Sequence, residues 1–411
     1  MKTEDYRDIS YKKRDNCLVC GTKHSRPIFK MSKFPLTEIY VEKKVTEKIG
    51  FIDQEFHLCD RCGHGQISNV VDPKVLYGSC YKTRTQGTTA VPAVDAFLDF
   101  VNTILDKNGI KTVESIFEIG CNDLYALKKM RNRANVLYGV DPILKGKESS
   151  VKDDKIKVIG DFFENVDVKA LGLKIGIVLS SHTLEHIEDP KKVVKSMIDN
   201  SSPDTLLFFQ FPALEELVQD AHFDQVFHQH LNYFSLQSVL CMLDDIGAEL
   251  VDFKINPMHW SAMMIAFRKK KKGADLNDKF KDMARTRSVS KDYVEKQYQV
   301  FKRCMDVTAK RIDALKGRVV YGFGAALMLP ILDYYTGKLS SLKFIIDDDP
   351  GKKDLYYLNV PVQIKPLSQV KDIEGSVFLV TAINSLKAVR AITKKLIEQD
   401  VEKIILPVNL I

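Results

Sequence analysis

The stretch SIFEIGCND, Ser115 to Asp123, decides the fold predicted for this chain. Its apolar residues predict a buried strand, and Gly120 turns the chain between that strand and the helix that follows. In an open α/β sheet, a glycine turn at the carboxyl end of a strand lets a ligand approach the backbone. The stretch therefore predicts the ligand-binding edge of a parallel sheet that is wrapped by helices.

Acidic residues follow the neighbouring strands in the same way. Asp141 ends the next strand, NVLYGVD, 23 residues after Glu118, where a carboxylate can accept hydrogen bonds from an adenosine ribose. Asp161 and Phe162 end the strand KIKVIGDFF, and an acid beside an aromatic ring suits an adenine. One glycine is not the GxGxxG fingerprint, so a dinucleotide is not the expected ligand of this first turn.

The bulk composition is that of a globular protein. Of the 411 residues, 45% are hydrophobic and 28% are charged, and the net charge of +7 comes largely from dispersed lysines. The basic run RKKKKG, residues 268–273, contains no aromatic residue, so binding to nucleic acid is not expected. No apolar run approaches the roughly 18 residues of a membrane span, and the polar amino terminus lacks the apolar core of a signal peptide. We therefore expect a cytoplasmic protein that does not bind membranes.

Four of the eight cysteines form two CxxC pairs, Cys17/Cys20 and Cys59/Cys62, each followed by glycine. Two such knuckles suit one tetrahedral zinc ion, and four thiolate ligands leave no open position for catalysis, so the expected ion is structural. Rubredoxin-like iron and unliganded thiols are the alternatives. The other cysteines, Cys80, Cys121, Cys241 and Cys304, are expected to be buried small residues. The nearby histidines, His24, His57 and His64, are expected to be surface residues, with spare metal ligands as the alternative.

Histidines gather after the predicted fourth strand. That strand, IGIVLSSHTLEHIEDP, ends at Ser181, His182 and Glu185, and the later segment FHQHLNYFS holds His228 and His230. Six of the nine histidines fall between residues 182 and 259, beside the predicted ligand edge, which favours acid–base chemistry. The alternative is a set of buried histidines bonded to the backbone. A metal held by His228 and His230 as a pair is less favoured, because side chains two residues apart diverge on a helix.

The carboxyl-terminal third begins with a predicted helix, capped by Ser290 and ended by Gly317, that bridges two domains. The stretch GRVVYGFGAALMLPILDYY then predicts a strand, a turn at Gly322 and Gly324, and a helix, and the strand LKFIIDDDP carries Asp348 at its end. This is a second Rossmann-like unit, whose glycine turn offers backbone amides to a diphosphate.

The order of these features resembles the class I S-adenosylmethionine-dependent methyltransferases, with EIGCND at the place of the glycine-rich motif and LEHIEDP after the fourth strand. With the CxxC pairs and FHQHLNYFS added, nearly the whole chain resembles the sugar C-methyltransferases, which methylate a carbon of a nucleotide-linked 4-keto-deoxysugar. The resemblance implies S-adenosylmethionine and structural zinc (Zn2+) as cofactors. It also implies a set of residues that hold S-adenosylmethionine: Glu118, Gly120, Asp123, Asp141, Asp161 and Phe162.

The same resemblance implies the catalytic residues. His230 matches the family's acid–base histidine and is the expected base, with His228, His259 or His182 as donors to an enolate oxygen. The expected contacts to the nucleotide sugar are Tyr233, Gly322, Gly324 and Asp348.

The active-site segment departs from the family at two positions. The family segment begins Tyr-His-Glu-His, whereas this chain has Phe227 without a hydroxyl and Gln229 without a titratable group. Methylation of a sugar oxygen, or binding of the sugar nucleotide without turnover, is therefore an alternative to carbon methylation.

The predicted organisation has four parts. They are a zinc-binding domain (residues 1–82), a methyltransferase domain (83–268), a helical bridge (269–316) and a carboxyl-terminal α/β domain for the substrate nucleotide (317–411). A dehydrogenase would explain only the last part, and a lone GxG turn is weak evidence for it. The expected class is an enzyme of α/β fold whose partner is a nucleotide sugar.

Overall fold

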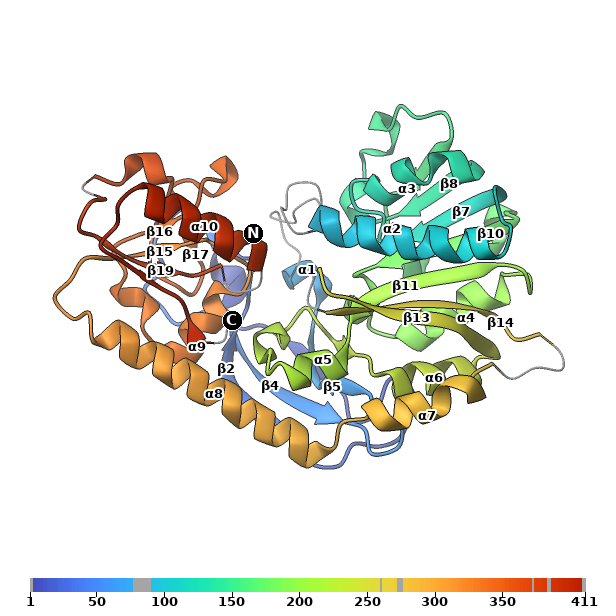
Figure 1. Ribbon diagram of the computed structural model, residues 1–411, viewed down its shortest axis with the longest axis horizontal. Coiled ribbons are helices and arrows are strands. Elements are labelled where there is room, and N and C mark those ends of the chain that lie inside the picture. The colour runs from blue at the N-terminus through green and yellow to red at the C-terminus, as the bar shows by residue number, and fades with distance from the viewer. Residues whose placement is uncertain are drawn as a thin grey trace.

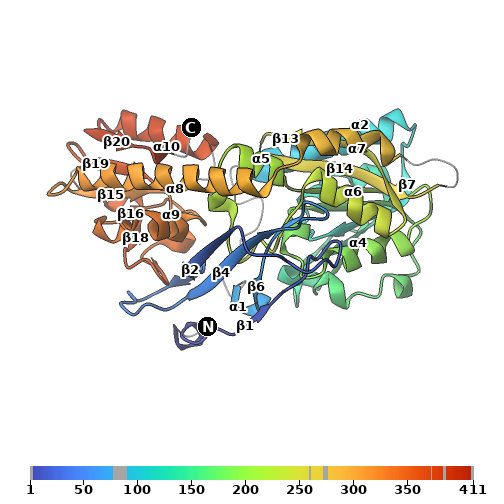
Figure 2. The same cartoon turned by 90° about the horizontal axis from the view of Figure 1, so that it is seen from below.

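The computed structural model describes residues 3–76, 90–258, 261–271, 276–371, 373–382 and 386–408. They form two α/β lobes with a small β domain between them, and one long helix runs past all three (Figure 1). The view from below shows the strands of the β domain lying across the gap between the lobes (Figure 2). None of the described helices is both long and apolar enough to cross a membrane.

The larger lobe is built on a seven-stranded sheet in the order β13-β14-β11-β10-β7-β8-β9. Strands β7 to β11 are parallel, and β14 is antiparallel to both of its neighbours. The strands are β7 (Val113–Ile119), β8 (Ala134–Val140), β9 (Ile156–Ile159), β10 (Ile175–Ser181), β11 (Leu206–Pro212), β13 (Ala248–Asn256) and β14 (Ala262–Lys269). The predicted parallel sheet is confirmed, and Ser115 to Ile119 of the opening stretch lie in β7, the middle one of the five parallel strands.

Helices cover both faces of this sheet, so the strands are apolar on both sides. Consecutive residues of a strand point to opposite faces: Ile116 packs with the helix α2, whereas Phe117 belongs to the core that contains α4 and α6. The helices of this lobe are α2 (Ala90–Lys107), α3 (Tyr125–Lys129), α4 (Pro190–Asp199), α5 (Leu214–Gln219) and α6 (Leu236–Asp245).

The amino-terminal β domain contains a four-stranded antiparallel sheet in the order β12-β5-β4-β2. One of its strands, β12 (Asn232–Tyr233), comes from the larger lobe. The domain's own elements are β1 (Tyr11–Lys13), β2 (Phe29–Pro35), β3 (Tyr40–Val41), β4 (Phe51–Leu58), β5 (Gly65–Ile67), β6 (Asn69–Val71) and α1 (Pro73–Leu76). The two domains therefore share a sheet rather than only a surface.

The second lobe is a five-stranded parallel sheet in the order β18-β16-β15-β19-β20. It confirms the second Rossmann-like unit. A short antiparallel pair between β3 and β17 (Tyr356–Tyr357) joins it to the amino-terminal domain. Its other elements are β15 (Val320–Phe323), α9 (Leu329–Thr336), β16 (Ile345–Ile346), β18 (Ile364–Lys365), β19 (Val377–Val380), α10 (Leu386–Glu398) and β20 (Lys403–Ile405).

The predicted bridging helix is confirmed as α8 (Lys291–Asp313), which follows α7 (Asp278–Arg287). The Ser290 hydroxyl caps it by accepting from the Tyr293 amide at 3.2 Å, and it ends at Asp313, earlier than the predicted Gly317. Its Tyr298 ring stacks on Phe29 of β2 with 3.8 Å between ring centroids. The helix therefore packs on the β domain as it passes between the lobes (Figure 1).

Candidate active site and zinc centre

The four cysteines of the two knuckles meet at one point. Their sulfur atoms lie within 4.8 Å of one another, with 3.6 Å between Cys17 and Cys62 and 3.4 Å between Cys20 and Cys59. A tetrahedral zinc ion with Zn–S bonds of about 2.3 Å holds its thiolates about 3.8 Å apart, so this donor set fits zinc. Four thiolates would fill its coordination sphere, which makes the ion structural.

The histidines near the zinc centre are less exposed than expected, and the prediction of surface positions is wrong for His57 and His64. Both are buried, and His57 stacks on the half-buried His24 with 4.6 Å between ring centroids. His64 is buried because the larger lobe covers it: its ring packs on Phe234 at 5.0 Å. Of the other cysteines, Cys121 is buried as predicted, Cys241 and Cys304 are half-buried, and Cys80 lies outside the described residues.

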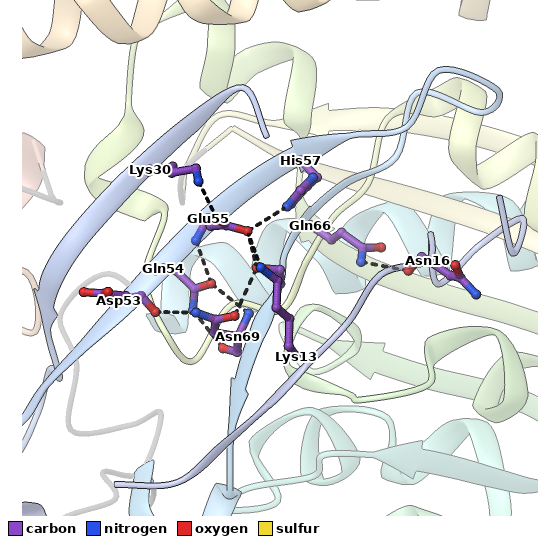
Figure 3. Close-up of polar contacts among 10 residues, drawn as sticks. Lys13, Asn16, Lys30, Asp53, Gln54, Glu55, His57, Gln66 and Asn69 are labelled. Carbon is purple, nitrogen blue, oxygen red and sulfur yellow. Dashed lines mark hydrogen bonds and ion pairs between the residues drawn. The ribbon is translucent and has the colours of Figure 1, made fainter. Parts of the chain in front are cut away.

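The strand β12 holds the histidine segment against the zinc-binding domain. Asn232 is paired with Gln66 of β5, and the Asn232 side-chain oxygen accepts from His64 Nε2 at 3.3 Å. Gln66 in turn accepts from the Leu18 amide inside the first knuckle and donates to the Asn16 carbonyl at 3.1 Å (Figure 3). A chain of hydrogen bonds thus connects the cysteine centre to the segment that carries His228 and His230.

His228 is a structural clamp between the two domains. Its Nε2 donates to the Phe34 carbonyl at 3.2 Å, and its Nδ1 accepts from the Gln54 amide at 3.2 Å. Gln54 and Asn69 hydrogen-bond reciprocally, which fixes the Gln54 side chain (Figure 3). Burial lowers the pKa of His228 to about 4, so the ring is neutral at pH 7. Both of its nitrogens are used by protein groups, which favours a positioning role.

The predicted cofactor residues lie at the carboxyl ends of β7, β8 and β9. Gly120 has a φ of 72°, and the non-glycine residues Asn122 and Leu124 also adopt positive φ angles. The Asn122 amide donates to Asp141 Oδ2 at 2.9 Å, which ties this turn to the end of β8. Left-handed non-glycine residues persist only where their surroundings impose them, and they cluster at ligand sites.

These residues have the chemistry to hold S-adenosylmethionine. Glu118 is fully buried under the turn, and Asp141 accepts the Ile143 amide at 3.0 Å with its other oxygen. Each carboxylate oxygen has a further lone pair, so Asp141 can still accept from ribose hydroxyls. The Asn165 side chain and the Phe162 amide hydrogen-bond to Asp161 and lower the pKa of its carboxyl. Phe162 and Asp123 are half-buried beside these groups in the chain, so the edge offers carboxylates and one aromatic ring.

Buried acid–base groups lie next to this edge. His182 follows β10 with a φ of 52°, and its Nδ1 lies 3.1 Å from Glu185 Oε1. Glu185 is fully buried, and ligand atoms of Glu185, His186 and His230 lie within 4.8 Å of one another. His230 also packs on Phe227 with 4.2 Å between ring centroids. The structure thus groups His182 and His230 around one carboxylate, whereas His259 lies outside the described residues.

The predicted nucleotide-sugar contacts fall in two places. Tyr233 is buried, accepts from the Phe227 amide and donates to the Gln225 carbonyl, both at 3.3 Å. Gly322 ends β15 together with Phe323, and Gly324 follows with a φ of 105° and no room for a side chain, because a Cβ would lie 2.5 Å from that of Ala382. Asp348 follows β16, and one of its oxygens accepts from the Leu367 amide at 3.2 Å. Tyr233 is thereby engaged by backbone groups, and the other three lie at one edge of the second sheet.

Two residues of this site were given no role from the sequence. Glu185 and His186 lie in η8 (Leu184–His186), the short turn after β10. The signals for them in the sequence were the place of Glu185 at the end of the predicted fourth strand and the place of His186 among the six clustered histidines. His186 Nδ1 donates to the Gln229 carbonyl at 2.8 Å, so it is joined to the FHQH segment through the backbone. This contact spans 43 residues of sequence, which periodicity cannot predict.

Two known protein families match this chain, one in its central part and one in its amino-terminal part. Residues 92–252 match a family described as "Methyltransferase domain", and residues 17–77 match one described as "Putative zinc binding domain". The sheet order and these matches show that the chain contains a methyltransferase domain of class I fold and, amino-terminal to it, a zinc-binding domain. The predicted fold, the predicted cofactors and the family resemblance are confirmed at this level.

One curated protein is similar in sequence to more than half of this chain. The chain is 23% identical to the C-methyltransferase NovU of Streptomyces niveus over 255 residues, which are 61% of this chain and 60% of that protein. The match thus spans less than two thirds of the relative's length.

Two solved structures show lower similarity. The match to the magnesium protoporphyrin IX methyltransferase of Synechocystis PCC 6803 has 14% sequence identity and a TM-score of 0.36. It covers 47% of this chain and 91% of that protein's chain. The match to the N-methyltransferase NodS of Bradyrhizobium japonicum WM9 has 12% sequence identity and a TM-score of 0.33. It covers 43% of this chain and 96% of that protein's chain.

Gly120→Ala should weaken binding of S-adenosylmethionine at least about tenfold, because left-handed backbone is strained for alanine. The new Cβ would also lie 2.8 Å from Thr183 Cγ2. Gly146→Ala is the matched control, since Gly146 has a φ of 74° but no atom within 4 Å of the added Cβ. Isothermal titration with S-adenosylmethionine measures both variants, and equal affinities would contradict the placement of the cofactor at the Gly120 turn.

His228→Gln should flatten the acid dependence of stability. The folded-state pKa of His228 is about 4, below the ordinary 6.5, so the unfolded chain binds the proton first as the pH falls. The stability from its neutral burial is complete above about pH 6.5 and is lost as the pH falls towards 4. Between about pH 7 and pH 5 the wild type should lose roughly 1–2 kcal/mol more unfolding free energy than the variant. Chemical denaturation at each pH measures the two slopes, and equal slopes would contradict the neutral clamp.

Proposed function

We propose that this protein transfers a methyl group from S-adenosylmethionine to a carbon beside the ketone of a nucleotide-linked deoxysugar. One observation carries the proposal: the segment after β10 belongs to both parts of the site. Thr183 donates to the Ile119 carbonyl at 3.4 Å beside the Gly120 turn, and His182 contacts Glu185 in the acid–base cluster. The similarity to a protein named as a C-methyltransferase supports the same reaction.

Carbon methylation explains why buried acid–base groups lie beside a cofactor edge. Bound S-adenosylmethionine supplies an electrophilic methyl group on a sulfonium ion. A nucleophile that already has a lone pair needs little more than correct positioning. A carbon beside a ketone must first lose a proton, so it needs a base and a group that stabilises the enolate oxygen. The cluster around Glu185 contains the residue types that meet both needs.

Two histidines can serve as the base. His230 is the first candidate, and its ring lies in a buried aromatic environment beside Phe227 and His186. His182 is the second, because a carboxylate that accepts from its Nδ1 fixes the tautomer in which Nε2 carries the lone pair that can take a proton. Gln229, at the position of the family's glutamate, contributes its backbone carbonyl to His186, and its side chain donates to the Leu76 carbonyl at 3.4 Å.

The nucleotide is assigned to the second lobe. The Ala325 amide, directly after Gly324, donates to Asp347 Oδ2 at 2.8 Å, and Lys352 Nζ bridges the same carboxylate and the Ala325 carbonyl. Tyr40 of the zinc-binding domain also donates to the Ala325 carbonyl, at 3.3 Å. This network supports a rigid glycine turn, and a turn with convergent backbone and lysine groups suits a diphosphate.

The test is mass spectrometry of nucleotide-linked 4-keto-6-deoxysugars incubated with the protein and S-adenosylmethionine, in water and in deuterium oxide. Carbon methylation predicts one added methyl group, loss of the hydrogen of the methylated carbon, and solvent deuterium at this same carbon in the sugar that is recovered unmethylated. His230→Ala should abolish methylation and leave cofactor affinity within about threefold, because it removes a catalytic group and not a cofactor contact.

His222→Ala is the control variant, since His222 is half-exposed and pairs with Asp224 outside the cluster. A methylated sugar that keeps the hydrogen of the carbon beside the ketone would instead indicate methylation of a sugar oxygen. Cofactor binding with no product from any sugar would contradict turnover of this substrate class.

A further inference from the structure

Glu185, His186 and His230 form a compact set of metal-binding side chains. Within the described part of the chain it is, besides the four cysteines, the other group of at least three ligand atoms that lie within 4.8 Å of one another. Glu185 and His230 are at most 1% exposed, and His186 is half-buried. Two imidazoles and one carboxylate are ligands typical of catalytic zinc and of non-haem iron.

The imidazole of His186 makes a hydrogen bond of the kind that metal-bound histidines make. Its Nδ1 donates to the Gln229 carbonyl at 2.8 Å, so the lone pair lies on Nε2. A metal-bound histidine usually makes this type of hydrogen bond with its other nitrogen, because the bond fixes the tautomer and the ring orientation.

The two segments that carry the ligands are fixed to each other. The Leu231 amide donates to the Glu185 carbonyl at 2.8 Å. The Asn232 side-chain amide donates to the carbonyls of Leu184 at 3.3 Å and Ile187 at 2.8 Å, on either side of the Glu185–His186 pair. Because the backbone holds the ligands together before any ion binds, little ordering is needed on binding.

We propose that Glu185, His186 and His230 bind one divalent first-row transition-metal ion, and that this ion holds the ketone oxygen of the substrate. The inference rests on the proposed function for its substrate. Three protein ligands leave coordination positions open, unlike the four cysteines of the structural centre. An ion there polarises the carbonyl as a Lewis acid and stabilises negative charge on its oxygen.

If the ion occupies this site, the catalytic roles of His230 and His182 follow from it. With His230 as a ligand, the base is the second candidate of the two, His182, whose Nδ1 donates to Glu185 so that the lone pair lies on Nε2. The carbon–hydrogen bond breaks, its electron pair forms the enolate double bond, and the ketone oxygen carries the charge against the ion. The enolate carbon then forms a bond to the methyl group as the sulfur–carbon bond breaks, with its electron pair left on sulfur. The ketone is restored, and His182 releases the proton to solvent.

The experiment counts metal ions in the full-length protein. Wild type, Glu185→Gln, His186→Asn and Glu215→Gln are incubated with Zn2+ or Mn2+, passed through a desalting column and measured by plasma mass spectrometry. Asparagine at position 186 keeps a donor for the Gln229 carbonyl and removes Nε2. Glu215 is the matched control: its buried carboxylate accepts from the Leu236 amide at 2.7 Å instead of facing histidines.

With at least one of the two ions, we expect about two equivalents per chain in the wild type and in Glu215→Gln, and about one in the other two variants, because the cysteine centre is intact in all four. One equivalent in the wild type with both ions would overturn the inference. A second equivalent retained by both Glu185→Gln and His186→Asn would also overturn it.

The metal inference and the proposed function fail separately. Metal stoichiometry is measured without a sugar, so two equivalents together with no methylated sugar would contradict only the substrate. Methylation by protein that holds one equivalent would contradict only the metal. Deuterium exchange into the sugar should fall at least about 100-fold in His186→Asn, as expected when a Lewis acid is lost.

Discussion

The geometry of the candidate active site depends on the pairing of β5 with β12. This pairing brings the segment after Phe227 into the sheet of the zinc-binding domain, with Asn232 opposite Gln66 and Tyr233 opposite Gly65. A two-residue strand is too short to be stable alone, so its geometry must come from the sheet that it joins. That sheet is in turn anchored on the cysteine centre, because a small domain with little core needs such an anchor.

In this arrangement, one part of the chain forms the candidate cofactor edge and another part positions the histidines. The parallel sheet supplies the cofactor edge, and its loops at Gly120 and His182 are held in left-handed conformations by the surrounding backbone. The zinc-binding domain positions the histidines, through Gln54 on His228 and His64 on Asn232. Burial of these polar groups is tolerable because each is hydrogen-bonded, and it keeps water from the carboxylate at Glu185.

Sequence reasoning could predict those features that local patterns determine. The two CxxC pairs, the Gly120 turn and the capped helix from Ser290 are each set by residues a few positions apart. It could not predict the contacts that only the folded chain creates. Gln54 and His228 are 174 residues apart, and nothing in the local sequence of either one indicates the other. The burial of His57 and His64 was missed for the same reason, since the residues that cover them lie elsewhere in the chain.

Hydrogen–deuterium exchange of Cys59→Ser beside the wild type tests most directly whether the zinc centre holds the histidine segment. Amides of residues 228–235 should lose protection together with those of β4 and β5, whereas β7 and β10 should stay protected, because their hydrogen bonds lie within the parallel sheet. S-adenosylmethionine should still bind. Undiminished protection of residues 228–235 in a variant that has lost its zinc would contradict the account.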